Sequence, residues 1–303
     1  MTSHETSHAD AHRRQPALID AGELAARLQR GDRIVVLDVR WSLAAAAAKD
    51  PASDVPVGFD EYRDGHIPGA LFVDLETELA AHASPDHGRH PLPSKTDFQE
   101  TVRSLGLQKD DFVVVYDDLA GMSAARAWWL LGFAGFRTAV LDGGLTAWVA
   151  SGRELETGSI PRPQASGVVI DWNRKPVLKH RDVAHFAQSG SLLDARAGER
   201  YRGESEPVDP RAGHVPGAIS APTSENVNES GHFKTTEALQ KRFESLLSAD
   251  VPVAVYCGSG VTAAHEILAL DIAGIDAALY PGSWSQWSND ESLPLETGSH
   301  KSL

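Results

Sequence analysis

The sequence is poor in cysteine, with a single one, Cys257, among its 303 residues. One cysteine excludes an intrachain disulfide, and it excludes a zinc or iron–sulfur site built from several cysteines. A lone thiol is compatible with a reducing compartment, so we expect the protein in the cytoplasm.

Long apolar runs are also absent. No stretch reaches the roughly 18 consecutive apolar residues that a membrane-spanning helix needs, so we expect no membrane partner. Residues 1–16 read MTSHETSHADAHRRQP and lack the apolar core of a secretory signal. His4, His8 and His12 have a spacing that could bind a metal along a helix, but the polar composition favours a disordered tail over residues 1–16.

Positive charge is scarce as well. Lys and Arg number 28 against 42 Asp and Glu, which gives a net charge of −14. This balance argues against a nucleic-acid partner and against electrostatic binding to anionic lipid. An anionic substrate would need a local positive potential at its own site.

The sequence does contain an internal repeat, which the length already allows, because domains typically span about 100–200 residues. Four segments recur in the same order, so the chain is a duplicated domain. The matching pairs are IVVLDVR (34–40) with SLLDAR (191–196), YRDGHIPGA (62–70) with RAGHVPGA (211–218), VVVYD (113–117) with VAVYC (253–257), and LDGGLTAW (141–148) with YPGSWSQW (280–287).

Each copy alternates short apolar strands with amphipathic or apolar helices, which predicts an α/β fold with a parallel sheet flanked by helices on both faces. We expect a first domain over 17–150, a second over 176–295, and between them a linker over 151–175, where Gly, Pro and Ser are frequent and neither copy matches well. The first copy carries an insertion over 43–58, LAAAAAKDPASDVPVG, which we interpret as a short helix or loop without a catalytic role.

The loop that follows the strand VAVY carries the chemistry. Cys257 stands at the carboxyl end of that strand, where parallel α/β sheets bind ligands, and the sequence CGSGVT then enters a helix. Gly258 and Gly260 free the backbone to turn its N–H groups inward, and the helix adds its positive end. These groups favour a nucleophilic thiolate over the alternative, a buried small apolar residue. A phosphatase would need an arginine six residues after the cysteine, where this sequence has Ala263.

Taken together, the duplicated domain, YRDGHIPGA, LYPGSWSQW and CGSGVT resemble the tandem-domain rhodanese family of sulfurtransferases. The likeness covers nearly the whole chain after residue 16. It implies two rhodanese-like domains with catalysis in the second. Asp117 takes the cysteine position of the first copy, so that copy is expected to be non-catalytic and to form one wall of the site.

Within that family, thiosulfate-using members resemble Cys-Arg-Lys-Gly-Val-Thr at this loop, and members that use 3-mercaptopyruvate resemble Cys-Gly-Ser-Gly-Val-Thr. This chain has the second form. The resemblance implies that Ser259 passes protons with His90 and with a carboxylate that Glu76 matches. It also implies that the donor contacts the rest of the loop, namely Gly258, Gly260, Val261 and Thr262.

The resemblance further implies arginines that hold the donor carboxylate. Arg200 matches the first of them. The second should follow a Glu-Pro pair, but Glu206-Pro207 is followed by Val208, and Arg211 is a candidate replacement.

The resulting hypothesis is a sulfurtransferase that moves sulfur from 3-mercaptopyruvate to a thiol, cyanide or a protein acceptor through a persulfide on Cys257. No metal or organic cofactor is implied. One alternative is thiosulfate as donor with the same nucleophile. Another is a module that carries a persulfide or regulates a partner without turning over.

Overall fold

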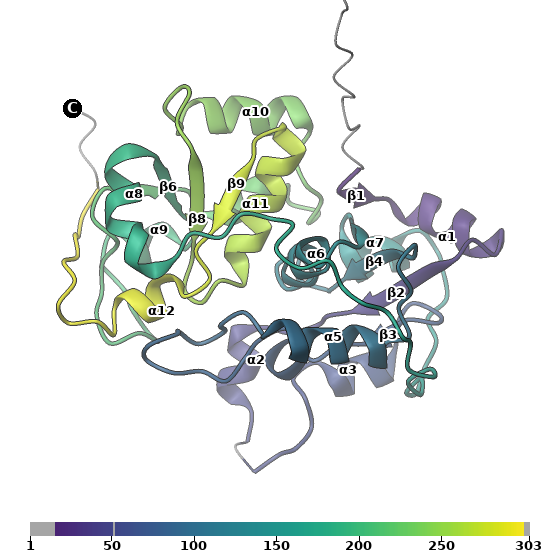
Figure 1. Cartoon of the computed structure of the whole chain (residues 1–303). Coiled ribbons are helices and arrows are strands. Elements are labelled where there is room, and N and C mark those ends of the chain that lie inside the picture. The colour runs from purple at the N-terminus through teal and green to yellow at the C-terminus, as the bar shows by residue number, and fades with distance from the viewer. Residues whose placement is uncertain (1–15, 51, 300–303) are drawn as a thin grey trace, which may run out of the picture.

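The computed structural model describes residues 16–50 and 52–299. The histidines at positions 4, 8 and 12, with almost all of the predicted tail, therefore lie outside the described residues. Figure 1 shows two halves side by side, with helices α6 (Ala124–Phe133) and α11 (Thr262–Ala273) between the two sheets. The longest of the described helices is α11 with 12 residues, and no described helix is long and apolar enough to cross a membrane.

The first half contains a five-stranded sheet in the order β1-β5-β4-β2-β3, with all neighbours parallel. Its central strands read as continuous β-branched and leucine runs because both of their faces are buried. The strands are β1 (Leu18–Ile19), β2 (Ile34–Asp38), β3 (Leu71–Phe72), β4 (Phe112–Tyr116) and β5 (Arg137–Leu141).

The second half repeats this topology. Its sheet has the order β7-β6-β8-β9, again parallel, and Val177 forms a parallel bridge to Leu279 at the place that β1 has in the first half. The strands are β6 (Ser191–Asp194), β7 (Ile219–Ser220), β8 (Val253–Tyr256) and β9 (Ala277–Leu279).

Helices cover both faces of each sheet, so the predicted fold class is confirmed. Successive strand side chains alternate between two buried clusters, because side chains along a strand point to opposite faces. In the first half, one face is covered by α1 (Ala21–Gln29) and α7 (Gly144–Ala150), and the other by α5 (Lys95–Ser104) and α6. In the second half, the corresponding pairs are α8 (Val183–Ser189) with α12 (Ser283–Trp287), and α10 (Thr236–Glu244) with α11.

The remaining helices are short and lie in the connections: α2 (Leu43–Ala48), α3 (Phe59–Asp64), α4 (Leu75–Glu78), α9 (Gly198–Tyr201), and the 3₁₀ turns η1 (His180–Asp182) and η2 (Thr223–Asn226). The predicted insertion over 43–58 thus contains a helix, α2, which begins at an N-cap where Ser42 accepts from the Ala45 amide.

The two halves share one apolar core. Helices α6 and α11 pack against each other, and one buried cluster runs through both halves. This packing explains why both helices are apolar nearly all round: each is covered by its own sheet and by the other helix.

The repeated GH-x-PGA segments hold strand ends in place. In the first half the Arg40 guanidinium donates to Asp38 and to the Gly65 carbonyl, both at 2.8 Å. Arg196 makes the equivalent two bonds in the second half at 2.6 and 2.7 Å. The motif is therefore structural in both copies.

The first repeat extends beyond the predicted boundary at residue 150. The peptide LETGS stands at 155–159 and again at 295–299. Backbone groups of His66 and Glu156 exchange two hydrogen bonds of 2.9 Å, and the equivalent histidine and glutamate of the second half do the same at 2.8 and 3.0 Å. The start of the predicted linker thus belongs to the repeated unit, because it pairs with the GH-x-PGA segment.

Candidate active site

Cys257 lies at the carboxyl end of β8, directly before α11, and its side chain faces a cavity of about 260 Å³ between the two halves. The first half contributes Trp41, Leu43, Arg89 and Met122 to the lining. The second contributes Ala195, Arg196, Ala197, Arg200, Thr223, Ser224, Cys257, Gly258, Ser259, Val261 and Thr262. Leu43 belongs to the insertion that was expected to have no catalytic role, so part of the insertion does reach the site.

The cysteine loop is held in one shape by its own backbone and by the start of α12. The Gly260 amide donates to Cys257 Sγ at 3.1 Å. Gly260 has φ +81°, and a Cβ there would lie 2.5 Å from the Pro281 carbonyl oxygen, so this position needs glycine. Ser283, itself at φ 55°, accepts from the Cys257 amide at 3.1 Å, and the Trp284 amide donates to the Cys257 carbonyl at 2.9 Å.

The matching loop of the first half is filled by its own carboxylate. Asp117 accepts five hydrogen bonds of 2.8–3.0 Å, from the amides of Leu119, Gly121, Ser123 and Ala124 and from the Ser123 hydroxyl. A loop of this shape therefore binds an anion with inward-pointing N–H groups. In the second half, Cys257 stands at the matching sequence position, and its sulfur accepts from the Gly260 amide.

The structure brings Ser259 and His90 together from opposite halves, with 2.8 Å between Ser259 Oγ and His90 Nδ1. Trp41 packs edge-on against the His90 ring at 5.2 Å between centroids. The Glu76 carboxylate accepts from the Trp41 indole at 3.3 Å. Glu76 thus bonds to Trp41, which packs on His90, whereas the family resemblance implied that its carboxylate passes protons with Ser259 and His90.

His90 is a neutral imidazole at physiological pH. Burial lowers the pKa of His90 to about 3, and the positive charges of Arg126 and Arg89 act in the same direction. A neutral ring can donate from one nitrogen and accept at the other, which suits it to pass a proton to or from Ser259.

Buried neutral histidines also make the stability depend on pH. Burial lowers the pKa of His265 to about 4 and that of His90 to about 3. Both histidines take up protons in the unfolded chain below pH ~6.5 and resist protonation when folded, so stability is present above that pH and is lost as pH falls. We expect the free energy of unfolding to fall by about 2 kcal/mol per histidine between pH 7 and pH 5.

Urea unfolding at the two pH values checks this expectation. His90→Gln should lose less stability on acidification than the wild type, by about 2 kcal/mol. His185→Gln is the matched control, because His185 is exposed, and it should lose as much as the wild type. An unchanged pH dependence in His90→Gln would show that His90 is not held neutral by burial.

Arg126 is a site residue that the sequence did not reveal. It lies on α6, its side chain is fully buried, and it donates to four backbone carbonyls at 3.0–3.2 Å, those of Leu79, His90, Pro91 and Gly260. Burial lowers its pKa to about 10, while the nearby Cys257 acts in the opposite direction. Arg126 therefore remains charged near neutral pH and is a buried positive charge beside the thiol. One signal could have found it: it is the one charged residue in an otherwise apolar helix.

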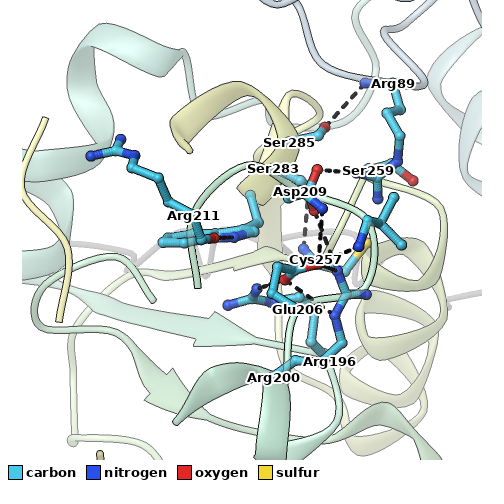
Figure 2. A network of polar contacts seen from close by, with 12 residues as sticks. Arg89, Arg196, Arg200, Glu206, Asp209, Arg211, Cys257, Ser259, Ser283 and Ser285 are labelled. Carbon is cyan, nitrogen blue, oxygen red and sulfur yellow. Dashed lines mark hydrogen bonds and ion pairs between the residues drawn. The ribbon is translucent and has the colours of Figure 1, made fainter. Parts of the chain in front are cut away.

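A cluster of three arginines and two carboxylates borders the cavity (Figure 2). Arg200 donates to Glu206 at 2.6 Å and to Asp209 at 3.3 Å, Arg89 forms an ion pair with Asp209, and Arg196 reaches Glu206 at 3.3 Å. Both carboxylates are only 3% exposed. Burial raises the pKa of Asp209, and the neighbouring arginines oppose that shift. The predicted Arg200 thus lies at the cavity, in a network where three carboxylates, those of Asp194, Glu206 and Asp209, face the three arginines.

Arg211 does not join this cluster. Its guanidinium donates to four backbone carbonyls at 2.6–3.0 Å, and Figure 2 shows the side chain extending away from Cys257. The four carbonyls belong to Trp287, Ser288, Asp290 and Leu293. Arg211 therefore holds the chain after α12 and does not supply the second arginine expected near Val208.

Comparison with known proteins identifies the family. The Rhodanese-like domain matches residues 20–151 and again residues 179–290. The chain belongs to the rhodanese family and has two such domains in tandem, as the resemblance implied.

Individual relatives are similar over almost the whole chain. SseB of Mycobacterium tuberculosis, which carries the provisional name thiosulfate sulfurtransferase, is 43% identical over 289 residues, 94% of this chain and 98% of SseB. A Pseudomonas aeruginosa protein with the provisional name 3-mercaptopyruvate sulfurtransferase is 44% identical over 297 residues, 93% of this chain and 98% of that protein. The crystal structure of SseA, a 3-mercaptopyruvate sulfotransferase from Escherichia coli, aligns with a TM-score of 0.76 at 34% identity and covers 89% of this chain and 99% of SseA.

Proposed function

We propose that this protein is a sulfurtransferase that takes sulfur from 3-mercaptopyruvate and passes it to a thiol, cyanide or a protein acceptor through a persulfide on Cys257. The observation that carries the choice of donor is the hydrogen bond of 2.8 Å between Ser259 and His90 beside the cysteine. That pair supplies a proton path, which only this donor needs. The second domain carries the nucleophile, and the first domain, with Asp117 at the cysteine position, has no nucleophile of its own but supplies His90 to the proton path.

The first step transfers sulfur to the enzyme. The Cys257 thiolate attacks the thiol sulfur of 3-mercaptopyruvate, and the carbon–sulfur bond breaks with its electron pair on carbon. The proton from the donor thiol moves to that carbon through Ser259 and His90, so pyruvate leaves and Cys257 holds a persulfide anion. The Gly260 amide and the Arg126 guanidinium lie where they stabilise the negative charge on sulfur.

The second step returns the enzyme to its starting state. A thiolate or cyanide attacks the outer sulfur of the persulfide, the sulfur–sulfur bond breaks, and its electron pair remains on Cys257 as a thiolate. With cyanide the product is thiocyanate. No proton has to move in that reaction.

Thiosulfate is the second candidate donor, since relatives with both kinds of name are similar to this chain. Attack of Cys257 on its outer sulfur would release sulfite directly, with no proton to transfer. The Ser259–His90 pair would then have no proton to transfer, and this difference favours 3-mercaptopyruvate.

The mass of the intact protein after reaction with the donor tests the proposal. Incubation with 3-mercaptopyruvate without acceptor should add about 32 Da, one sulfur atom, to the peptide that contains Cys257. Cyanide should then remove the adduct and yield thiocyanate. If neither 3-mercaptopyruvate nor thiosulfate produces the adduct, the proposal fails. An adduct that no acceptor can discharge would identify a carrier module without turnover.

Replacing Ser259 separates the two donors. Ser259→Ala should lower kcat with 3-mercaptopyruvate by about 10- to 100-fold, the usual contribution of a positioned proton-transfer group, and change the rate with thiosulfate less than about threefold. Steady-state rates with both donors are the measurement. Ser245→Ala, at the C-cap of α10 and away from the cavity, is the matched control. An equal loss with both donors would contradict the proton-transfer role.

The setting of the reaction follows from the chemistry. Cys257 has to stay reduced between turnovers, which supports the cytoplasm as the compartment. Because the net charge is −14, a small anionic donor has to be attracted locally by the arginines at the cavity, and this charge gives no support to nucleic acid or a membrane as partner.

A further inference from the structure

We propose that Arg89, from the first domain, is the second cationic group of the donor site and binds the donor carboxylate together with Arg200. This inference rests on the proposed function, because it names the residue that recognises the charged end of the donor. It also accounts for the second cationic group, because position 208, where the family resemblance implies an arginine, is a valine.

Two guanidinium groups converge on the cysteine loop at Gly258. A Cβ built on Gly258 would lie 2.9 Å from Arg89 Nη2 and 3.4 Å from Arg200 Nη1. Gly258 is not among the glycines with positive φ, so its backbone does not itself require glycine. The absence of a side chain instead leaves room for the two cations directly next to Cys257.

Arg89 is held in place with part of its guanidinium unused. Its backbone amide donates to Ser285 Oγ at 3.0 Å, and its Nη1 forms the ion pair with Asp209. Its Nε is buried without a hydrogen-bond partner among the described residues. The nitrogen that faces the cysteine loop is Nη2, and a carboxylate that enters the cavity would accept a charge-assisted bond from it.

The other cations near the cavity are committed elsewhere. Arg196 uses its guanidinium on Asp194, Glu206 and the Gly213 carbonyl, and its side chain is 2% exposed. Val208 is an apolar side chain that is 41% exposed, so it offers no charge to the donor. Arg89 and Arg200 are therefore the two guanidinium groups positioned at the mouth of the cysteine loop.

The duplication explains why the second cation comes from the other domain. The loop before α5 carries Arg89 across to Gly258, and the loop before α10 extends in the same way to the Asp117 loop, since Phe233 Cε2 would lie 3.5 Å from a Cβ on Gly121. Each domain thus covers the anion-binding loop of the other. At the loop that holds Cys257, the residue that reaches across is Arg89, which carries a permanent positive charge.

A pair of donors that differ only in charge tests the proposal. Arg89→Gln should lower kcat/KM for 3-mercaptopyruvate by about 10- to 100-fold, mainly through KM, and lower that for its uncharged methyl ester less than about threefold. Arg89→Lys should have a kcat/KM between those of the wild type and Arg89→Gln, because lysine keeps the positive charge but lacks the planar guanidinium that can donate two parallel hydrogen bonds. Arg181→Gln is the matched control for the loss of one charge, since Arg181 is 77% exposed, and it should match the wild type.

Two further variants guard against a folding defect. Arg89→Gln/Asp209→Asn removes the ion pair as a unit, and it should show the same selective loss with the charged donor. Gly258→Ala leaves both arginines in the chain but introduces a Cβ at 2.9 Å from Arg89 Nη2, and it should lower kcat/KM for the charged donor by about 3- to 10-fold. An equal loss with the acid and with its ester in these variants would overturn the assignment of Arg89.

Binding of pyruvate to the resting protein tests Arg89 as a carboxylate ligand independently of the proposed sulfur transfer. By calorimetry, Arg89→Gln should bind pyruvate with a Kd about 10-fold higher than that of the wild type, whether or not the protein transfers sulfur. An unchanged Kd would count against Arg89 as a carboxylate ligand. A wild type that binds pyruvate but takes sulfur from neither donor would count against the proposed function alone.

Discussion

Cys257→Ser is expected to abolish sulfur transfer, with a loss of at least about 10⁴-fold in kcat/KM and no sulfur adduct in the intact mass. A serine hydroxyl in this loop is a far weaker nucleophile than a thiolate and cannot form a persulfide. The fold should be retained, because Cys257 is 1% exposed and serine fills nearly the same space. Thiocyanate formation from either donor, measured at a temperature well below the unfolding midpoint, gives the result.

Asp117→Asn provides the control at the matching position of the first domain. It weakens the five hydrogen bonds to the carboxylate and should lower the unfolding midpoint, while sulfur transfer stays within about threefold of the wild type. Residual transfer of more than about 1% in Cys257→Ser would contradict the mechanism, since the chain has no other cysteine to replace it.

The local charge at the site differs sharply from that of the whole protein. The net charge is −14, yet Arg89, Arg196, Arg200 and Arg126 all lie at or beneath the cavity against three buried carboxylates, those of Asp194, Glu206 and Asp209. Charges on the outer surface are screened beyond about 8–10 Å at physiological ionic strength, whereas these groups are buried or mostly buried and are screened less. An anionic donor therefore meets a positive potential once it reaches the cavity.

The duplication made the fold predictable to a large extent. The paired strand segments are apolar runs that only a sheet covered on both faces explains, and both sheets have the same strand order in the structure. The end of the first repeat was harder to place, because LETGS at 155–159 is polar and its role is to pair with His66 through backbone atoms. Such pairing leaves little trace in hydrophobic periodicity.

The site was predictable where the residues are close to the cysteine in sequence. The loop from Cys257 to Thr262 and its strand-to-helix position follow from local pattern alone. Arg89 and Arg126 come from the other domain, and no local pattern tells which way the loop before α5 extends or what helix α6 packs against. Arg211 shows the converse: an arginine in a suitable segment can turn to backbone carbonyls instead of the cavity.

Arg126→Met is expected to have the second-largest effect and to act on both stability and catalysis. Loss of a donor costs about 1–3 kcal/mol for each buried carbonyl, and release of a desolvated cation offsets part of that, so we expect a net loss of about 3–5 kcal/mol. Arg126 also ties the segment that carries Arg89 and His90 to the Gly260 carbonyl of the cysteine loop, and it places a positive charge near Cys257. Sulfur transfer should therefore fall by at least about 100-fold.

Arg103→Met separates the catalytic effect of Arg126 from its effect on stability. Arg103, in the first domain, also donates to a backbone carbonyl, that of Val168 in the linker at 2.9 Å, but it does not line the cavity. Its loss should lower the unfolding midpoint and leave kcat/KM unchanged. With both variants assayed well below their midpoints, a kcat/KM for Arg126→Met within about threefold of the wild type would refute its role at Cys257. The large loss we expect would mean that a buried arginine of the first domain supports the reaction at Cys257 in the second domain.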